Sequence, residues 1–191
     1  MPKPKLLIVI ASTRPARVGR PVGDWFTQFA TEHGGFEVTE ADLAELALPV
    51  FDEPNHPRLK SYTKDHTIAW SKLVDAADAV VFITPEYNHS FPASLKNAID
   101  YLSQEWKYKP LGFVSYGGIA AGTRAVQALK PVASALMMYV ASNLVNIAWI
   151  GQHIKDGKFV SDADTDTAAK AMLDELLVLD SGLRVIRQPS A

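Results

Sequence analysis

A polar loop near the start of the chain carries side chains that could hold a phosphate group. It spans Ser12–Arg20, directly after the apolar segment Leu6–Ala11, and a helical pattern of apolar residues follows it. Hydroxyls and arginines donate hydrogen bonds to phosphate oxygens, and a helix N-terminus adds free N–H groups and a positive dipole end. The loop matches neither Gly-x-x-x-x-Gly-Lys nor Gly-x-Gly-x-x-Gly, which argues against a triphosphate site or the usual dinucleotide turn. For this loop alone, a solvated turn with exposed arginines is an equal alternative.

A second candidate loop begins at Thr84. It follows the apolar run Ala79–Ile83, which is typical of a buried parallel strand. Pro85 lacks the N–H that a strand ladder needs and predicts the end of that strand, and Pro92 suits the first position of the next helix. In open α/β sheets, ligands bind beside the carboxyl ends of strands, which is where this loop would lie.

A third loop, Tyr116–Gly122, is small and rich in glycine, and it follows the strand-like segment Leu111–Ser115. Glycines allow the backbone to approach a flat ligand closely, although a simple turn into the next helix is the plainer interpretation. The three loops follow the first, third and fourth predicted strands. In a doubly wound sheet of order 2-1-3-4-5, those strand ends converge, so the sequence predicts one shared ligand site.

The predicted fold is an α/β, flavodoxin-like three-layer sandwich, with a five-stranded parallel sheet of order 2-1-3-4-5 and helices on both faces, as one domain over residues 1–191. The predicted strands lie near Lys5–Ala11, Phe36–Asp42, Ala79–Ile83, Gly112–Ser115 and within Met138–Asn146. The predicted helices lie near Gly19–Glu32, Leu59–Ala77, from Pro92 to Glu105 at the latest, from Thr123 onward and Asp162–Leu179.

Four local features accompany these elements. Leu43–Pro57 reads as a long loop, Pro131 is expected to kink or divide its helix, and Asp156-Gly157 marks a turn. The tail from Ser181 is expected to be loose.

Composition fits a cytoplasmic globular protein. The chain has 191 residues, 48% of them hydrophobic, and a net charge of −2 without a block of like charge, so nothing points to nucleic acid or an anionic membrane. It has no cysteine, which excludes disulfides, thiol catalysis and cysteine-ligated metals. No segment approaches the roughly 20 apolar residues that a membrane-spanning helix needs.

With these motifs, the chain resembles the NADPH-dependent FMN reductase family, flavodoxin-like flavoenzymes that include quinone, azo-dye and chromate reductases. The matching pieces are Ser12–Arg14, Pro85–Asn88 leading into Leu95–Ala98, and Ser115–Gly118, with support from Asp42–Ala44 and from His66-Thr67 and Trp70. The chain departs from the family where Ala11 stands in place of a glycine and Val18 in place of a serine. The resemblance covers roughly Lys5 to Leu179.

The resemblance implies FMN as cofactor, NADPH or NADH as hydride donor, and a small-molecule acceptor such as a quinone, a free flavin or an azo compound. FMN would carry the hydride chemistry in ping-pong order, with no catalytic side chain and no metal. The residues expected to bind the cofactor are Ser12, Arg14, Arg17, Val18, Gly19, Pro85, Glu86, Tyr87, Asn88, Ser115, Tyr116, Gly117 and Gly118.

Other functions remain open at this level. Ser12, His89 and Asp100 have the residue types of a hydrolase triad, but the chain has no Gly-x-Ser-x-Gly elbow, and the five histidines lack zinc-ligand spacing. Glu86 fits a solvated loop charge better than a catalytic acid. A flavodoxin-like electron carrier and a non-enzymatic redox-sensing module would use the same fold.

A homodimer or a dimer of dimers is also implied, built on the helices that begin near Pro92 and Thr123. Tyr101, Leu102, Trp106 and Tyr108 offer more apolar surface than one inward face requires. Large aromatic residues are enriched at interfaces, so Trp106 or Tyr108 is expected near the partner's flavin. The alternative is that Trp106 covers the end of its own sheet.

Overall fold

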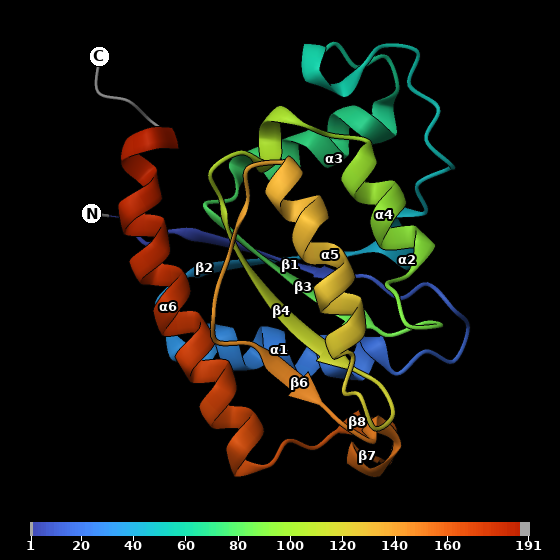
Figure 1. Ribbon diagram of the computed structural model, residues 1–191, viewed down its shortest axis with the longest axis vertical. Helices are drawn as coiled ribbons and strands as arrows, with labels where there is room; N and C mark the ends of the chain where they lie inside the picture. The colour runs from blue at the N-terminus through green and yellow to red at the C-terminus, as the bar shows by residue number, and fades with distance from the viewer. Residues whose placement is uncertain (1, 188–191) are drawn as a thin grey trace.

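The computed structural model describes residues 2–187 and has a parallel sheet at its centre (Figure 1). The strand order is β2-β1-β3-β4-β5, which confirms the predicted flavodoxin-like order 2-1-3-4-5. The strands of this sheet are β1 (Lys5–Ile10), β2 (Glu37–Asp42), β3 (Ala79–Pro85), β4 (Pro110–Tyr116), β5 (Tyr139–Val140) and β6 (Val145–Ile147). The carboxyl ends of β1, β3 and β4 therefore lie side by side.

Helices cover both faces of the sheet, as predicted. The helices are α1 (Gly19–His33), α2 (Leu43–Leu46), α3 (Asp65–Ala76), α4 (Ala93–Asp100), α5 (Thr123–Ala135) and α6 (Ala163–Arg187). Leu6, Ile8 and Ile10 pack with α1 and α6 on one face. Leu7 and Val9 pack with α3, α4 and α5 on the other. The alternation arises because successive strand side chains point to opposite faces, and burial on both faces explains the unbroken apolar run.

Several predicted boundaries shift in the structure. The helix expected over Leu59–Ala77 is a short 3₁₀ turn, Pro57–Leu59, followed by α3 from Asp65. The fifth strand is interrupted, because β5 and β6 both pair with β4 but at different heights along it. Asp156-Gly157 forms the predicted turn, here between the two short strands of a hairpin, β7 (Ile154–Lys155) and β8 (Lys158–Phe159).

Pro131 was expected to kink or divide its helix; it lies inside α5 without dividing it, so the division is wrong. Proline removes one backbone donor, but a helix can continue when its apolar face is well packed. Val126, Leu129 and Ala133 of α5 are buried against the sheet. Their burial provides that packing.

The prediction of a loose tail from Ser181 is also wrong for the residues described, because α6 continues to Arg187. Asp180 is 2% exposed and accepts hydrogen bonds from Arg184 and Arg187. Arg187 also bonds Asp78 at 3.1 Å and the carbonyl of Tyr108 at 3.0 Å. These contacts fix the end of α6 to two loops, and residues 188–191 lie outside the described part.

Three of the residues predicted to anchor a dimer, Tyr101, Leu102 and Trp106, are part of the protein's own core, which overturns their use as exposed anchors. Tyr101 and Trp106 are fully buried, and Leu102 is 2% exposed. The Trp106 indole donates to the carbonyl of Ile99 at 3.1 Å and packs edge-on against Trp70 and Phe82. Trp106 therefore covers its own sheet, which was the alternative interpretation. Tyr108 is half-buried, and its position near a partner's flavin stays a prediction.

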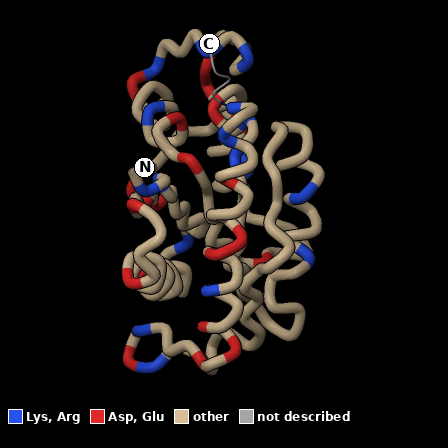
Figure 2. The backbone as a smooth tube through the Cα atoms, turned by 90° about the vertical axis from the view of Figure 1, so that its left-hand side faces the viewer, with Lys and Arg blue, Asp and Glu red and all other residues tan. Residues whose placement is uncertain are grey.

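Charges of both signs are spread along the chain, as Figure 2 shows. Within residues 2–187, no helix is long and apolar enough to cross a membrane. Over the same residues, no three metal-binding side chains are gathered in one place.

Candidate functional site

The three loops predicted to share a site do meet at the carboxyl edge of the sheet. The Tyr116 hydroxyl, at the end of β4, donates to Ser12 Oγ after β1 at 3.2 Å. The N–H of Glu86, after β3, donates to the carbonyl of Tyr116 at 3.1 Å. Residues about a hundred positions apart in sequence are thus brought together by the strand order.

The loop after β1 leads into an uncapped helix. Among the described residues, no side chain caps α1 at Val18, and no acidic residue stands in its first turn. An exposed arginine, Arg14, lies in the same loop. A helix start without a protein cap keeps its N–H donors and its positive dipole end available to an anion.

Ser12, Gly19 and Tyr116 pack tightly at the base of this loop. Ser12 is 1% exposed and Tyr116 is 3% exposed. Burial raises the pKa of Tyr116, so its hydroxyl stays protonated and donates to Ser12. Because Ser12 Oγ accepts that bond, its own proton is free for another acceptor. A Cβ on Gly19 would stand 2.1 Å from Ser12 Oγ, so only glycine fits there.

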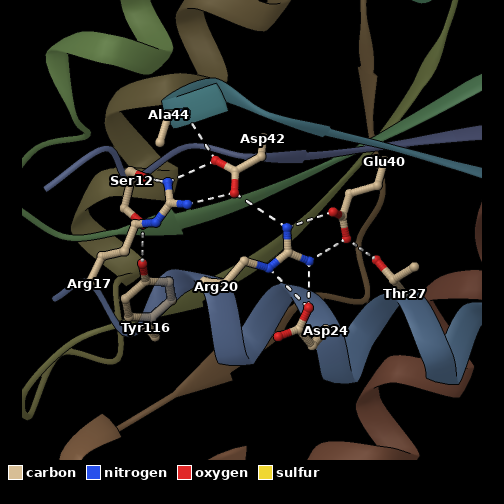
Figure 3. A network of polar contacts seen from close by, with 9 residues as sticks. All are labelled: Ser12, Arg17, Arg20, Asp24, Thr27, Glu40, Asp42, Ala44 and Tyr116. Carbon is tan, nitrogen blue, oxygen red and sulfur yellow. Dashed lines mark hydrogen bonds and ion pairs between the residues drawn. The ribbon is translucent and has the colours of Figure 1, made fainter. Parts of the chain in front are cut away.

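Arg17 does not face open solvent as a phosphate ligand would. Figure 3 shows its guanidinium directed at Asp42, at the end of β2. Arg17 donates to both Asp42 carboxylate oxygens, at 2.7 and 2.6 Å, and to the carbonyl of Ser12 at 2.5 Å. Both terminal nitrogens of the Arg17 guanidinium already donate to Asp42. Direct contact between Arg17 and the cofactor therefore stays a prediction.

Arg20 extends the same network to the next turn of α1 (Figure 3). It donates to Glu40 at 2.6 and 2.8 Å, to Asp24 at 2.6 Å and to Asp42 at 3.3 Å. Burial alone would raise the pKa of Glu40, but the hydrogen bonds from Arg20 and Thr27 outweigh it and lower that pKa. The hydrogen bond to Glu40 is the main cause that raises the pKa of Arg20. Two of the loop's three arginines therefore bind acidic residues.

The loop after β3 closes in a tight reversal at Tyr87–Ser90. The backbones of Tyr87 and Ser90 exchange two hydrogen bonds, at 2.9 and 3.0 Å. Asn88 and His89 both have positive φ, 49° and 65°, as a two-residue turn of this hand requires. The turn leaves Tyr87 36% exposed at the mouth of the site. It also occupies the Tyr87 N–H, which is thus not available to a ligand.

Glu86 is a paired charge, not a solvated one. Its side chain is 8% exposed and accepts from Arg124 Nε at 2.5 Å, and the Arg124 guanidinium also lies 2.9 Å from His89 Nε2. Arg124 stands at the start of α5, so this contact ties the loop after β3 to the loop after β4. Arg124 was not among the residues predicted from the sequence, because nothing near it in sequence signals a partner 38 residues away.

The glycines of the loop after β4 have distinct roles. Gly122 has φ 80°, and a Cβ there would stand 2.6 Å from the Tyr116 backbone nitrogen, so it is required by the fold. Gly117 is partly enclosed, since its Cβ would meet the Gly122 nitrogen at 3.3 Å, and its N–H donates to Ile147. Gly118 faces open space, with nothing within 4 Å of a built Cβ. Gly118 is therefore the glycine that a flat ligand could approach.

The remaining predicted site residues and the alternative triad have clear positions. Pro85 ends β3, and the Ser115 hydroxyl, fully buried, donates to the carbonyl of Ala121 at 2.8 Å. The three candidate triad groups each have other partners: Ser12 bonds Tyr116, His89 contacts Arg124 and Asp100 pairs with Lys96. The described structure does not assemble a hydrolase triad from them.

Comparisons with known proteins agree with this arrangement. The family model of NADPH-dependent FMN reductase matches residues 4–150. An NAD(P)H-dependent FMN reductase of Schizosaccharomyces pombe is 41% identical over 143 residues, which are 74% of this chain and 71% of that protein. An NADPH azoreductase of a Bacillus species is 34% identical over 131 residues, 67% of this chain and 70% of that protein.

The fold has a solved counterpart in FerB, a flavoenzyme NAD(P)H:(acceptor) oxidoreductase from Paracoccus denitrificans. The TM-score is 0.75 at 20% identity, with 94% of this chain and 98% of that chain covered. The matched region spans β1 to β6 and includes all three loops of the site. On the family model and the yeast relative, this chain belongs to the NADPH-dependent FMN reductase family.

Proposed function

We propose that this enzyme takes hydride from NADPH or NADH through bound FMN and passes the electrons to a quinone, a free flavin, an azo compound or a similar acceptor. The observation that carries the proposal is the pairing of an uncapped α1 start with an open glycine loop at one sheet edge. The uncapped start of α1 suits a phosphate, and the open glycine loop suits a flat ring. The family membership and an azoreductase relative support the redox chemistry.

Each loop has a distinct proposed task. Arg14 and the backbone from Val18 to Gly19 would hold the phosphate, with Ser12 as the floor of the site. Pro85–Asn88 would border one edge of the ring, and Ser115–Gly118 the other. Within Pro85–Asn88 and Ser115–Gly118, the backbone N–H groups of Asn88 and Gly118 have no hydrogen-bond partner among residues 2–187 and could stabilise negative charge on a ligand.

When bound, FMN supplies the hydride chemistry, and the chain supplies binding and orientation. Gly118 would lie against one face of the ring, and the opposite face, near the exposed Tyr87, would stay open to a second flat molecule. A single open side would serve donor and acceptor in turn, which predicts ping-pong kinetics. No side chain of the site is assigned a proton transfer.

Anaerobic mixing of FMN-loaded protein with NADPH or NADH tests the proposal. Loss of the oxidised-flavin absorbance within seconds, followed by recovery on addition of a quinone, is the expected result. A flavodoxin-like carrier would bind FMN without this bleaching. A protein that binds no FMN would contradict the reductase, the carrier and an FMN-binding redox sensor alike.

Arg14→Ala is expected to weaken FMN binding by about 10–150-fold, or roughly 1.5–3 kcal/mol, because one charge-assisted hydrogen bond to the phosphate is lost. Riboflavin lacks the phosphate and should bind both proteins equally. Fluorescence titration with the two flavins measures the difference. Unchanged FMN affinity would remove Arg14 from the phosphate site.

We also propose a homodimer or a dimer of dimers, built on α4 and α5, the helices predicted near Pro92 and Thr123. With Trp106 buried, the support comes from a broad groove whose apolar lining includes Phe51, Ile99, Leu102, Val132, Leu136 and Met137. Val50 and Leu59, on the segment beside it, are 87% and 69% exposed. Large apolar side chains gathered round one groove are typical of an interface.

Val50→Asp is expected to weaken this association by placing a charge in an apolar interface. Light scattering of the unchanged protein should give at least twice the 20.9 kDa of one chain, and the variant should shift toward that single-chain mass. Val178→Asp is the matched control, since Val178 is 72% exposed on α6, away from the groove. A single-chain mass for the unchanged protein would end the dimer proposal.

A further inference from the structure

We propose that Asp42 is a positioning residue for the phosphate loop and acts through Arg17. The inference rests on the proposed function, in which the loop after β1 holds the FMN phosphate. Asp42 is on neighbouring strand β2 and has no assigned contact with the cofactor. It lies behind the loop, and its carboxylate determines where the loop backbone sits.

Arg17 and Asp42 form a clamp, an ion pair held in one geometry by two hydrogen bonds. Both terminal nitrogens of Arg17 meet both oxygens of Asp42, at 2.6 and 2.7 Å, and a third bond reaches the carbonyl of Ser12. The Asp42 side chain is 1% exposed and that of Arg17 is 14% exposed. A two-bond fork between arginine and carboxylate fixes orientation as well as distance, and burial shields it from solvent screening.

Asp42 connects more than one element. Its Oδ1 accepts the N–H of Ala44 at 2.9 Å and so caps α2, and its Oδ2 also receives Arg20 from α1 at 3.3 Å. At the start of the phosphate loop, the carbonyl of Ser12 accepts a hydrogen bond from Arg17. Where the loop meets α1, Gly19 packs on the Ser12 side chain. Asp42 thereby links the end of β2, the start of α1 and both ends of the loop.

This assignment and direct phosphate binding by Arg17 predict opposite effects for one substitution. If Asp42 only holds Arg17 away from the ligand, then Asp42→Asn frees a guanidinium and removes a negative charge, and FMN should bind more tightly. If Asp42 positions the loop, the same change loosens the backbone donors and FMN should bind more weakly. The sign of the change in FMN affinity therefore decides between loop positioning by Asp42 and direct phosphate binding by Arg17.

The experiment compares FMN and riboflavin affinities, by fluorescence titration, for the unchanged protein and Asp42→Asn. The expected result is FMN affinity about ten-fold lower or more, with riboflavin affinity unchanged, because only the phosphate uses the loop. Glu40→Gln is the matched control. It makes the same change of charge in the same network, but Glu40 contacts Arg20 and Thr27 and not Arg17. It should leave both affinities unchanged.

Arg17→Gln extends the test and protects it against a folding defect in Asp42→Asn. Arg17→Gln should lower FMN affinity by a similar factor, and the double variant should be no weaker than either single one, since both break one clamp. Tighter FMN binding by Asp42→Asn, or additive losses in the double variant, would overturn the proposal. Circular dichroism and thermal melting establish that each variant is folded.

Failure of the inference is distinguishable from failure of the proposed function. If the unchanged protein binds FMN no better than riboflavin, the phosphate site itself is wrong. If it prefers FMN and Asp42→Asn keeps the full preference, the phosphate site stands and the positioning role of Asp42 is wrong. If Glu40→Gln loses as much of the preference for FMN over riboflavin as Asp42→Asn does, the loss comes from the charge network as a whole, and the specific role of the Arg17–Asp42 pair is wrong.

Discussion

Gly118→Val is expected to give a folded protein that is largely colourless. The structure leaves the space around Gly118 empty, so a valine there meets no protein atom within 4 Å of its Cβ. In the proposed complex the flavin ring occupies that space, and the branched side chain would collide with it. The expected loss of FMN affinity exceeds about ten-fold, or about 1.4 kcal/mol. Flavin absorbance per chain after reconstitution measures it.

Gly118 is a sharper test than Gly117, where a side chain would press on the loop itself at Gly122. Gly182→Val is the control, because Gly182 also faces open space but lies on α6, far along the chain from every loop of the site. Both variants should have melting temperatures close to that of the unchanged protein. If Gly118→Val retains full flavin and full NADPH oxidation, the loop after β4 does not line the ring site.

Gly19→Ala is expected to disrupt the base of the phosphate site. The new methyl group would stand 2.1 Å from Ser12 Oγ and 2.5 Å from the Tyr116 hydroxyl, both buried, so one of them must move. Forcing an extra methyl group into a packed site costs about 1–3 kcal/mol of stability. Because the same atoms form the floor beneath the proposed phosphate, FMN affinity should fall more than riboflavin affinity.

Gly23→Ala separates lost stability from lost binding. Gly23 is one turn further along α1, and its Cβ would stand 2.2 Å from Ile10 Cδ1 in the core, away from Ser12. It should lower the melting temperature but leave the ratio of FMN to riboflavin affinity unchanged. An equal drop in that ratio for both variants would mean that Gly19 acts only through general stability.

Much of the fold was predictable from sequence because its signals are local. The short apolar runs of β1, β3 and β4 are typical of strands buried on both faces. The apolar spacing of α1 predicted its C-terminal end to within one residue. The predicted strand order, 2-1-3-4-5, is a doubly wound order that brings the three ligand-competent loops to one edge of the sheet. The meeting of the loops after β1, β3 and β4 was predicted on that basis and is confirmed by the Ser12–Tyr116 contact.

The sequence by itself determined the strand order and the three loops, whereas the tertiary structure decided which residue in each loop is free. Arg14 and Arg17 look alike in sequence, but only Arg17 meets a buried carboxylate, from a strand that ends 25 residues later. The sequence pattern predicted Trp106 as a surface anchor, but a 3₁₀ turn over Gln104–Trp106 packs it against Phe82 of β3. Gly118 and Gly122 are the same residue type in one loop, but Gly122 has a φ of 80° and close backbone neighbours, whereas Gly118 faces open space. Ion pairing and burial depend on partners distant in sequence, and local patterns carry no record of those partners.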